Sequence, residues 1–179
     1  MRDPDDAFAA PRQPDGVTCG ATCVAAARAR RDTAYARALR EDPAATIRAE
    51  HRQLARWRDH DGSRRLPWPR ALGSSPWSVA DALADVEGRT YAVRLLPRDP
   101  AQAFREVSAL RLDCPAALYV GSRWMPRHVT LVTRTDGQTL EILEPAAGQV
   151  LRLRDDRIAA DPRIAGWPRW WLLVSPARR

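Results

Sequence analysis

Hydrophobic residues occur along this chain in short runs, and their spacing changes from mostly helix-like to mostly strand-like about halfway. In the first half, Ala-rich runs that follow Pro, Gly or Asp predict helices. In the second half, short apolar runs rich in β-branched residues and bounded by turn residues predict strands. The predicted helices are residues 19–31, 43–57, 79–86 and 100–110, and the predicted strands are 90–95, 115–120, 128–133, 139–143, 149–153 and 170–174.

This order of elements predicts an α+β fold in which N-terminal helices pack on a C-terminal antiparallel β-sheet, rather than alternating βαβ units. At this length we expect a single domain over 1–179, of which 1–12 form an irregular N-terminal lead-in. The Pro- and Gly-rich stretch 59–77 predicts a long loop. Ser78 is the predicted N-cap of the third helix, and the run 170–174 is expected to close the sheet.

A hairpin is predicted where the sequence reads Arg-Thr-Asp-Gly-Gln over 134–138. If its loop is 135–137, His128 lies directly across from Glu144, and a carboxylate there can hold the imidazole. A two-residue loop instead turns Glu144 to the other face of the sheet. We prefer the first register because it also pairs apolar residues with one another.

All 29 basic residues are Arg, and the net charge is +7. An excess of basic over acidic residues can indicate a nucleic-acid partner. Because the arginines are scattered and Ala and Pro are also abundant, we interpret the excess as a coding bias and expect no nucleic-acid partner. No run of about 18 apolar residues exists, so we expect no membrane partner. The acidic start lacks an apolar signal region, so we expect a cytoplasmic protein, although signal-less secretion is compatible with the same sequence.

The three cysteines argue against a disulfide framework because their number is odd. Cys19 and Cys23 stand four residues apart, but no second pair of ligands follows at zinc-site spacing. We therefore expect no metal site and no cofactor. Cys23 is expected to pack in the core, and Cys114, at the start of a strand, is expected to be structural.

Cys19 opens the first predicted helix, where the positive end of the helix dipole favours the nucleophilic thiolate. Gln13, six residues upstream, can place a side-chain amide where an oxyanion forms during acyl transfer. His128 is the only histidine in a strand-like segment and is the candidate base. In the preferred register Glu144 orients it. Together these residues predict a thiol-dependent acyl-transfer site.

The order of these residues resembles the papain-like cysteine peptidases, in particular stand-alone relatives of the double-glycine leader peptidase (bacteriocin-processing) group. The matching pieces are Gln13, Cys19-Gly20, the helix and strand over 101–120, His128 to Val132, and Glu144-Pro145 with Gly148. The resemblance implies a papain-like fold, with a thiol–imidazole site between a helix and an antiparallel sheet. It also implies that Gln13 stabilises the oxyanion and that Cys19 is the nucleophile. His128 is then the base, and Glu144 orients His128. The family usually has Asp or Asn where this chain has Glu144.

The leading hypothesis is a thiol hydrolase that cleaves peptide or amide bonds of a peptide or protein substrate through an acyl-enzyme. One alternative is a Gln deamidase or transglutaminase-type effector that uses the same residues. Another is a catalytically inactive peptide-binding module of the same fold. The sequence points to no particular oligomeric state.

Overall fold

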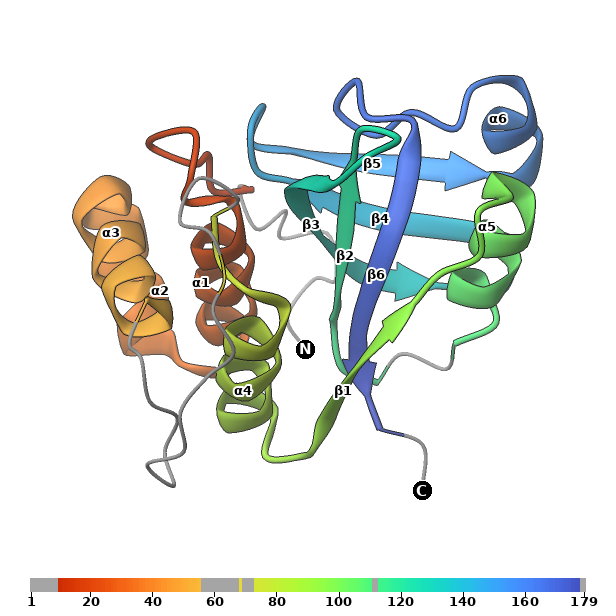
Figure 1. Cartoon of the computed structure of the whole chain (residues 1–179). Coiled ribbons are helices and arrows are strands. Elements are labelled where there is room, and N and C mark those ends of the chain that lie inside the picture. Colours follow the sequence, from red (N-terminus) through yellow and green to blue (C-terminus); the bar gives the residue numbers. More distant parts are fainter. Residues whose placement is uncertain (1–9, 56–67, 69–72, 111–112, 178–179) are drawn as a thin grey trace.

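The computed structural model describes residues 10–55, 68, 73–110 and 113–177 (Figure 1). The expected lead-in 1–12 is therefore described only from residue 10 onward. Most of the expected loop 59–77 also lies outside the described residues.

Four helices gather at one side of the molecule, around the first of them (Figure 1). They are α1 (Cys19–Arg31), α2 (Thr33–Glu41), α3 (Pro43–Leu54) and α4 (Pro76–Glu87). Ten of the 13 residues of α1 are buried, because its small side chains let neighbouring elements approach it from several directions. The carboxylates of Asp32 and Asp42 accept backbone N–H groups in the first turns of α2 and α3 and so fix where these helices begin.

Two of these helices differ from the prediction. α2 was not predicted, because a single residue, Asp32, separates it from α1 and neither Gly nor Pro marks the break. α4 begins at Pro76, earlier than predicted, and its N-cap is Ser75, not Ser78. The Ser75 hydroxyl accepts the backbone N–H of Ser78 at 3.0 Å, and a proline at the first helical position is compatible with that start.

The C-terminal half forms one six-stranded antiparallel sheet. Its strands are β1 (Tyr91–Leu95), β2 (Ala116–Gly121), β3 (Pro126–Thr135), β4 (Thr139–Glu144), β5 (Gln149–Arg154) and β6 (Arg169–Pro176). Their order across the sheet is β1-β6-β2-β3-β4-β5. β6 thus lies inside the sheet between β1 and β2, and the expectation that it closes an edge is wrong. Its apolar run at 172–174 suits such an interior position, because both faces of the sheet are covered there.

Helices pack on both faces of the sheet. On one face α1 contacts β3, and α4 contacts β1 and β6; on the other lie α5 (Pro100–Ser108) and α6 (Asp155–Ala160), a short helix that was not predicted. The strands divide their side chains between two cores accordingly. In β2, Ala117 and Tyr119 join the core that contains α1, whereas Leu118 and Val120 join the other. The predicted α+β fold, with N-terminal helices on a C-terminal antiparallel sheet, is confirmed.

The β3–β4 hairpin closes differently from the prediction. Thr135 pairs with Leu140, so the loop is longer than the expected 135–137. The carboxylate of Asp136 accepts the backbone N–H groups of the two residues that lead into β4, at 2.9 and 2.7 Å. These side-chain bonds favour the wider turn.

A β-bulge at Thr133 then changes the register within the same hairpin, and Leu131 pairs with Leu143. Beside the loop, a residue of β3 pairs with the residue of β4 that lies three positions further along the chain than predicted. Beyond the bulge the difference is two positions. A displacement by an even number keeps side chains on the same face. His128 and Glu144 therefore share a face as expected, but they are not directly opposite each other.

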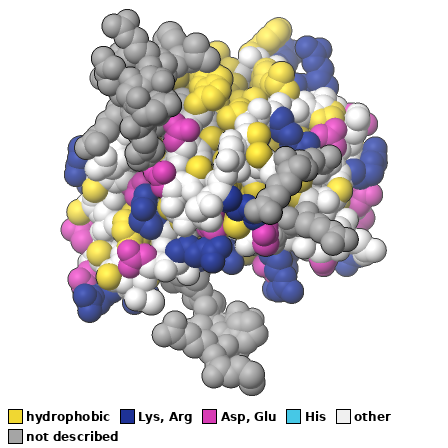
Figure 2. All heavy atoms as spheres, turned by 90° about the horizontal axis from the view of Figure 1, so that it is seen from below, with side chains coloured by type: hydrophobic (Ala, Val, Ile, Leu, Met, Phe, Trp, Pro, Cys, Tyr) yellow, Lys and Arg dark blue, Asp and Glu magenta, His cyan; other side chains and the backbone are white. Residues whose placement is uncertain are grey.

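Within the described residues, no helix combines the length and the apolar character needed to cross a bilayer. Figure 2 views the molecule from below Figure 1, and on this face arginines and acidic side chains are interspersed. The described part of this face thus shows no continuous basic track of the kind that a nucleic-acid backbone favours.

Candidate active site

The three residues predicted to carry acyl transfer meet where the N-terminus of α1 approaches β3. Cys19 is the first residue of α1, His128 lies near the start of β3, and Glu144 ends β4. All three side chains are buried, with exposed fractions of 2%, 6% and 3%. The His128 ring forms a hydrogen bond with the Glu144 carboxylate, and the Cys19 thiol is close enough to help raise the pKa of His128.

The bond between His128 and Glu144 is short, with 2.7 Å between Nε2 and Oε1. Because Nε2 is engaged by Glu144, Nδ1 is the ring nitrogen left for the thiol. Continuing the register of β3 and β4 would place residue 146 opposite His128, so Glu144 reaches the ring diagonally. Diagonal neighbours lie about 7–8 Å apart, within reach of a long side chain.

The turn after β4 holds the Glu144 carboxylate from the other side. Oε1 accepts the backbone N–H of Ala146 and Oε2 that of Ala147, each at 2.8 Å. The carboxylate therefore has three donors, of which one is the imidazole. It is fixed in place and does not depend on the ring alone.

These contacts set the charges at the site. Burial by itself lowers the pKa of His128, but hydrogen bonds to Cys19 and Glu144 and their negative charge raise it to about 9. Burial tends to raise the pKa of Glu144, but the hydrogen bonds from His128 and the two turn amides outweigh this effect and lower it. At neutral pH the pair is thus imidazolium and carboxylate.

The start of α1 presents its backbone donors as well as its thiol. The N-cap residue, Thr18, makes no side-chain bond to the first turn, and its hydroxyl instead donates to the carbonyl of Asp15 at 3.2 Å. The first N–H groups of a helix have no acceptor within the helix. The backbone N–H of Cys19 can accordingly donate a hydrogen bond to an anion that forms next to the Cys19 sulfur.

Gln13 lies beside the turn that holds Glu144. Its backbone N–H donates to the carbonyl of Pro145 at 2.7 Å, and Arg12 Nε donates to that of Ala146 at 3.0 Å. Gly148 permits this contact, because a Cβ there would lie 2.9 Å from Arg12 Cβ and its φ of +65° disfavours other residues. Gln13 Oε1 is buried and has no hydrogen-bond partner among the described residues. The unpartnered atom of this side chain is therefore a hydrogen-bond acceptor.

A short segment before α4 packs against Cys19, and no local sequence signal predicted this contact. Gly73 adopts a φ of +72°, and a Cβ on it would lie 3.8 Å from the Cys19 sulfur. The next residue, Ser74, packs so closely on Gly20 that a Cβ on Gly20 would lie 2.8 Å away. The buried Tyr119 hydroxyl donates to the Ser74 carbonyl at 3.1 Å and holds this segment. In the sequence, Gly20 and Gly73 were the only indication of such close contacts.

The other cysteines differ in environment from Cys19. Cys23 is fully buried, and burial, helped by the nearby Cys19 and Glu144, raises its pKa well above the ordinary value. Cys114 is also buried, with Arg89 Nη1 3.5 Å from its sulfur. All three are free thiols. The described residues contain no group of three or more His, Cys, Asp or Glu side chains that could hold a metal ion.

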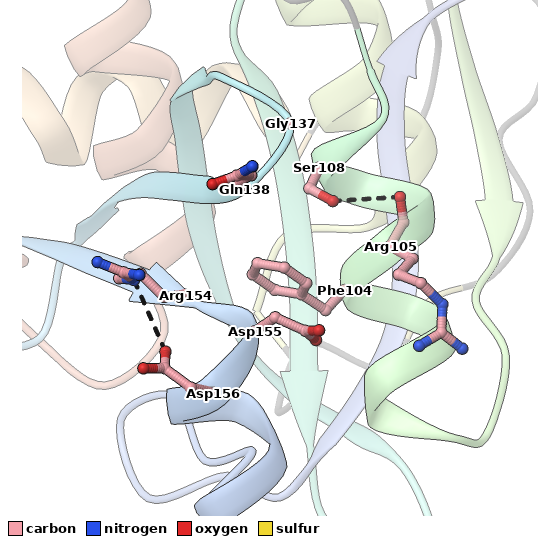
Figure 3. A pocket seen from close by; sticks show the side chains of 8 residues that line it. All are labelled: Phe104, Arg105, Ser108, Gly137, Gln138, Arg154, Asp155 and Asp156. Atoms are coloured by element: carbon pink, nitrogen blue, oxygen red, sulfur yellow. Dashed lines mark hydrogen bonds and ion pairs between the residues drawn. The ribbon is translucent and has the colours of Figure 1, made fainter.

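A hollow of about 470 Å³ lies elsewhere, between α5, the loop of the β3–β4 hairpin and the end of β5 (Figure 3). Its polar side chains bond within the protein: Arg154 Nε lies 3.7 Å from Asp156, and the Ser108 hydroxyl donates to the Arg105 carbonyl. The hairpin loop follows the far end of β3, roughly 25–30 Å of strand from His128. This hollow therefore takes no part in the thiol–imidazole site.

No protein-family model and no curated protein sequence matches this chain. Among solved structures, the peptidase domain of Streptococcus ComA, a bi-functional ABC transporter involved in a quorum-sensing pathway, is 16% identical with a TM-score of 0.48, over 95% of this chain and 99% of that domain. A double glycine motif protease from an AMS/PCAT transporter, solved in complex with the leader peptide, is 14% identical with a TM-score of 0.49, over 93% of this chain and 89% of its own. The peptidase domain of Streptococcus mutans ComA is 14% identical with a TM-score of 0.44, over 95% and 99%. At this low sequence identity these comparisons concern the fold alone.

Proposed function

We propose that this protein is a thiol hydrolase that cleaves peptide or amide bonds through an acyl-enzyme. Cys19 is the nucleophile, His128 the general acid and base, and Glu144 the residue that orients His128. The observation that supports this most strongly is that a buried imidazole bonds at 2.7 Å to a carboxylate which two backbone amides also hold. That arrangement is what activation of a nucleophile by an oriented base requires.

In the acylation step the Cys19 thiolate attacks the carbonyl carbon of the scissile bond. The new S–C bond forms while the carbonyl π electrons move to oxygen, which gives a tetrahedral oxyanion. His128 then donates its Nδ1 proton to the leaving nitrogen as the C–N bond breaks and the C=O bond re-forms. The products of this step are a free amine and a thioester on Cys19.

In the deacylation step His128 is neutral and acts as the base. Its Nδ1 removes a proton from water as the water oxygen attacks the thioester carbon. Collapse of the second tetrahedral oxyanion breaks the S–C bond and releases the carboxylic acid. The thiolate and the imidazolium are restored, while Glu144 stays ionised throughout.

The oxyanion of both steps needs hydrogen-bond donors, and we assign them to the backbone N–H of Cys19 and the side-chain amide of Gln13. The uncapped first turn of α1 supports the first assignment, and the second follows from the position of Gln13 in the sequence, six residues before Cys19. A lost donor of this kind slows acyl transfer by about 100- to 1,000-fold. Gln13→Ala should therefore lower the acylation rate far more than it lowers the melting temperature.

The acyl-enzyme can be tested without knowledge of the natural substrate. An activated ester, p-nitrophenyl acetate, should give a burst of one equivalent of nitrophenol and an acetyl group that mass spectrometry locates on Cys19. Cys19→Ala should abolish the burst, and Cys23→Ala, which removes a thiol one turn along the same helix, should keep it. A burst of unchanged size in folded Cys19→Ala would refute the proposal.

The bond that is cleaved follows from a second experiment with a library of peptides derived from a proteome. New N-termini that depend on Cys19 identify a peptidase. Conversion of Gln to Glu, a gain of about 1 Da, or attachment of an added amine would instead identify the deamidase or transglutaminase-type activity. Binding of peptides with no burst on the activated ester would identify an inactive module and refute the enzymatic proposal.

A further inference from the structure

A second group of side chains lies at the end of the sheet that also carries His128. It consists of Arg98 after β1, Arg169 and Trp171 at the start of β6, and Arg123 and Trp124 in the β2–β3 hairpin. We call these five residues the Arg–Trp cluster. None of them takes part in the acyl-transfer mechanism described above.

Strand pairing places the cluster close to the catalytic base. Val120 of β2 pairs with His128 on one side and with Trp170 on the other, and the next residue, Gly121, pairs with Arg169. Neighbouring strands lie about 4.8 Å apart, so the backbones of Arg169 and His128 are roughly 10 Å apart across two strand spacings. Trp171 also packs against the hydrophobic core that contains Cys19.

The cationic and aromatic groups of the cluster are held in position. Trp171 Nε1 donates to the carbonyl of Ser122 at 2.9 Å, and the Arg169 guanidinium lies 4.3 Å from the centre of the Trp171 ring. In the hairpin, the Arg123 guanidinium lies 4.5 Å from the centre of the Trp124 ring. Trp124 is 73% exposed, so this ring offers an open apolar surface.

No acidic side chain among the described residues pairs with the cluster. Among the described residues, neither Arg98 nor Arg169 has a carboxylate partner, whereas Arg94 of the neighbouring strand pairs with Glu106 at 3.4 Å. Arg169 Nε is buried and has no hydrogen-bond partner among the residues described. Burial, together with the positive charge of Arg98, lowers the pKa of Arg169. Two arginines that repel each other and retain an unused buried donor are suited to an anion.

We propose that the Arg–Trp cluster binds a carboxylate of the substrate, on an acidic side chain a few residues from the scissile bond. An extended peptide advances about 3.3–3.6 Å per residue, so the roughly 10 Å from His128 correspond to about three residues. The guanidinium of Arg169 binds the carboxylate, and the exposed Trp124 ring covers the apolar part of the same segment. The inference relies on the proposed function only in that it takes the ligand to be a substrate segment.

An acidic peptide fits the cluster better than a nucleic acid does. A nucleic-acid backbone presents a phosphate at every nucleotide and is bound by basic groups along a track. The cluster offers three arginines confined to one end of the sheet and next to the acyl-transfer site. Binding of an oligonucleotide is nevertheless a distinct outcome that the experiment below detects.

The test measures binding to the full chain carrying Cys19→Ala, so that no turnover occurs. The probes are two fluorescein-labelled, C-terminally amidated decapeptides, one of alternating Ala and Glu and one of alternating Ala and Gln, and an oligothymidylate of ten nucleotides. We expect the Glu peptide to bind about tenfold more tightly than the Gln peptide at low ionic strength. Arg169→Gln should remove this preference, and Arg169→Lys should keep part of it, because Lys retains the charge but not the planar fork.

Arg40→Gln is the matched control, because it makes the same charge change at an exposed position at the end of α2. It should leave the preference for the Glu peptide within twofold of the parent value. An equal loss in Arg40→Gln would show that overall charge, not the cluster, attracts the peptide. Oligothymidylate binding that exceeds that of the Glu peptide and depends on Arg169 would also overturn the proposal, as would the absence of any preference.

The two proposals fail in different ways. If the cluster does not bind the acidic peptide but the ester burst on Cys19 is present, only the cluster proposal falls. If the peptide binds through Arg169 but no burst occurs, only the proposed hydrolase function falls.

Discussion

Shortening Glu144 to Asp tests whether the length of this side chain positions the His128 imidazole. Its carboxylate lies 2.7 Å from His128 Nε2 and 2.8 Å from the amide nitrogens of Ala146 and Ala147. Asp withdraws the carboxylate by about one C–C bond, or ~1.5 Å. A contact lengthened that far is no longer a hydrogen bond, so Asp cannot keep the imidazole and both amides.

The magnitude follows from the kind of bond that is lost. A hydrogen bond to a charged group contributes about 1.5–3 kcal/mol. If the imidazole loses this bond, it is free to rotate away from the sulfur, and acylation should slow by about 10- to 100-fold. Glu144→Gln keeps the length but turns an N–H₂ group toward the amide donors of the turn, so we expect it to be slow as well.

The assay is the burst rate with p-nitrophenyl acetate, with thermal unfolding recorded for each variant. Glu141→Asp is the control on the same strand, because Glu141 accepts from Arg152 Nε at 3.1 Å away from the acyl-transfer site. It should leave the rate within about twofold, as expected for a surface ion pair. A folded Glu144→Asp variant with the wild-type rate would refute the positioning role. Equal slowing by Glu141→Asp would show that the effect is not specific to position 144.

Three further outcomes follow from the same contacts. Because the folded state raises the pKa of His128 from 6.5 to about 9, its stabilising contribution is complete below about pH 6.5 and is lost as the pH rises toward 9. In urea unfolding, the free energy of unfolding that His128 contributes should accordingly be up to about 3 kcal/mol lower at pH 9.5 than at pH 6. The His128→Gln variant should not show this loss. Gly148→Ala should lower the free energy of unfolding by about 1–3 kcal/mol and slow the ester burst. Gly137 also has a positive φ, but the space around it is open. Gly137→Ala should therefore destabilise the protein less and leave the burst unchanged. Iodoacetamide should label Cys19 of the native protein but not Cys23, whose pKa burial raises, and peptide mapping by mass spectrometry reads this directly.

Elements with local signals were predictable from the sequence. The Ala-rich run that became α1 was predicted with its observed bounds, because Pro and Gly precede it and basic residues end it. The Asp-Pro pairs before α3 and α5 marked both starts, and each Asp caps its helix. The hydrogen bond between His128 and Glu144 was also anticipated, since strand alternation fixes which residues share a face.

Features that depend on distant contacts were not predictable. The bulge at Thr133 reflects packing of β3 between two neighbours, which no local pattern encodes. The interior position of β6 is a matter of topology, and its apolar run is equally compatible with an edge. The segment of Gly73 and Ser74 lies beside Cys19, and the Tyr119 hydroxyl that bonds to it is 45 residues away in sequence.

The turn over 145–148 joins parts of the site that are far apart in sequence. Its amides hold the Glu144 carboxylate from within, and its carbonyls bind the segment that carries Gln13. An orienting group and a candidate oxyanion donor are therefore placed by one piece of backbone, while Cys19 is placed by α1, which packs on β3. A shift of this turn would move the carboxylate and the amide together relative to the sulfur. Because acyl transfer needs all of these groups at once, the close fit at Gly148 matters to the chemistry although no atom of that residue touches the reacting groups.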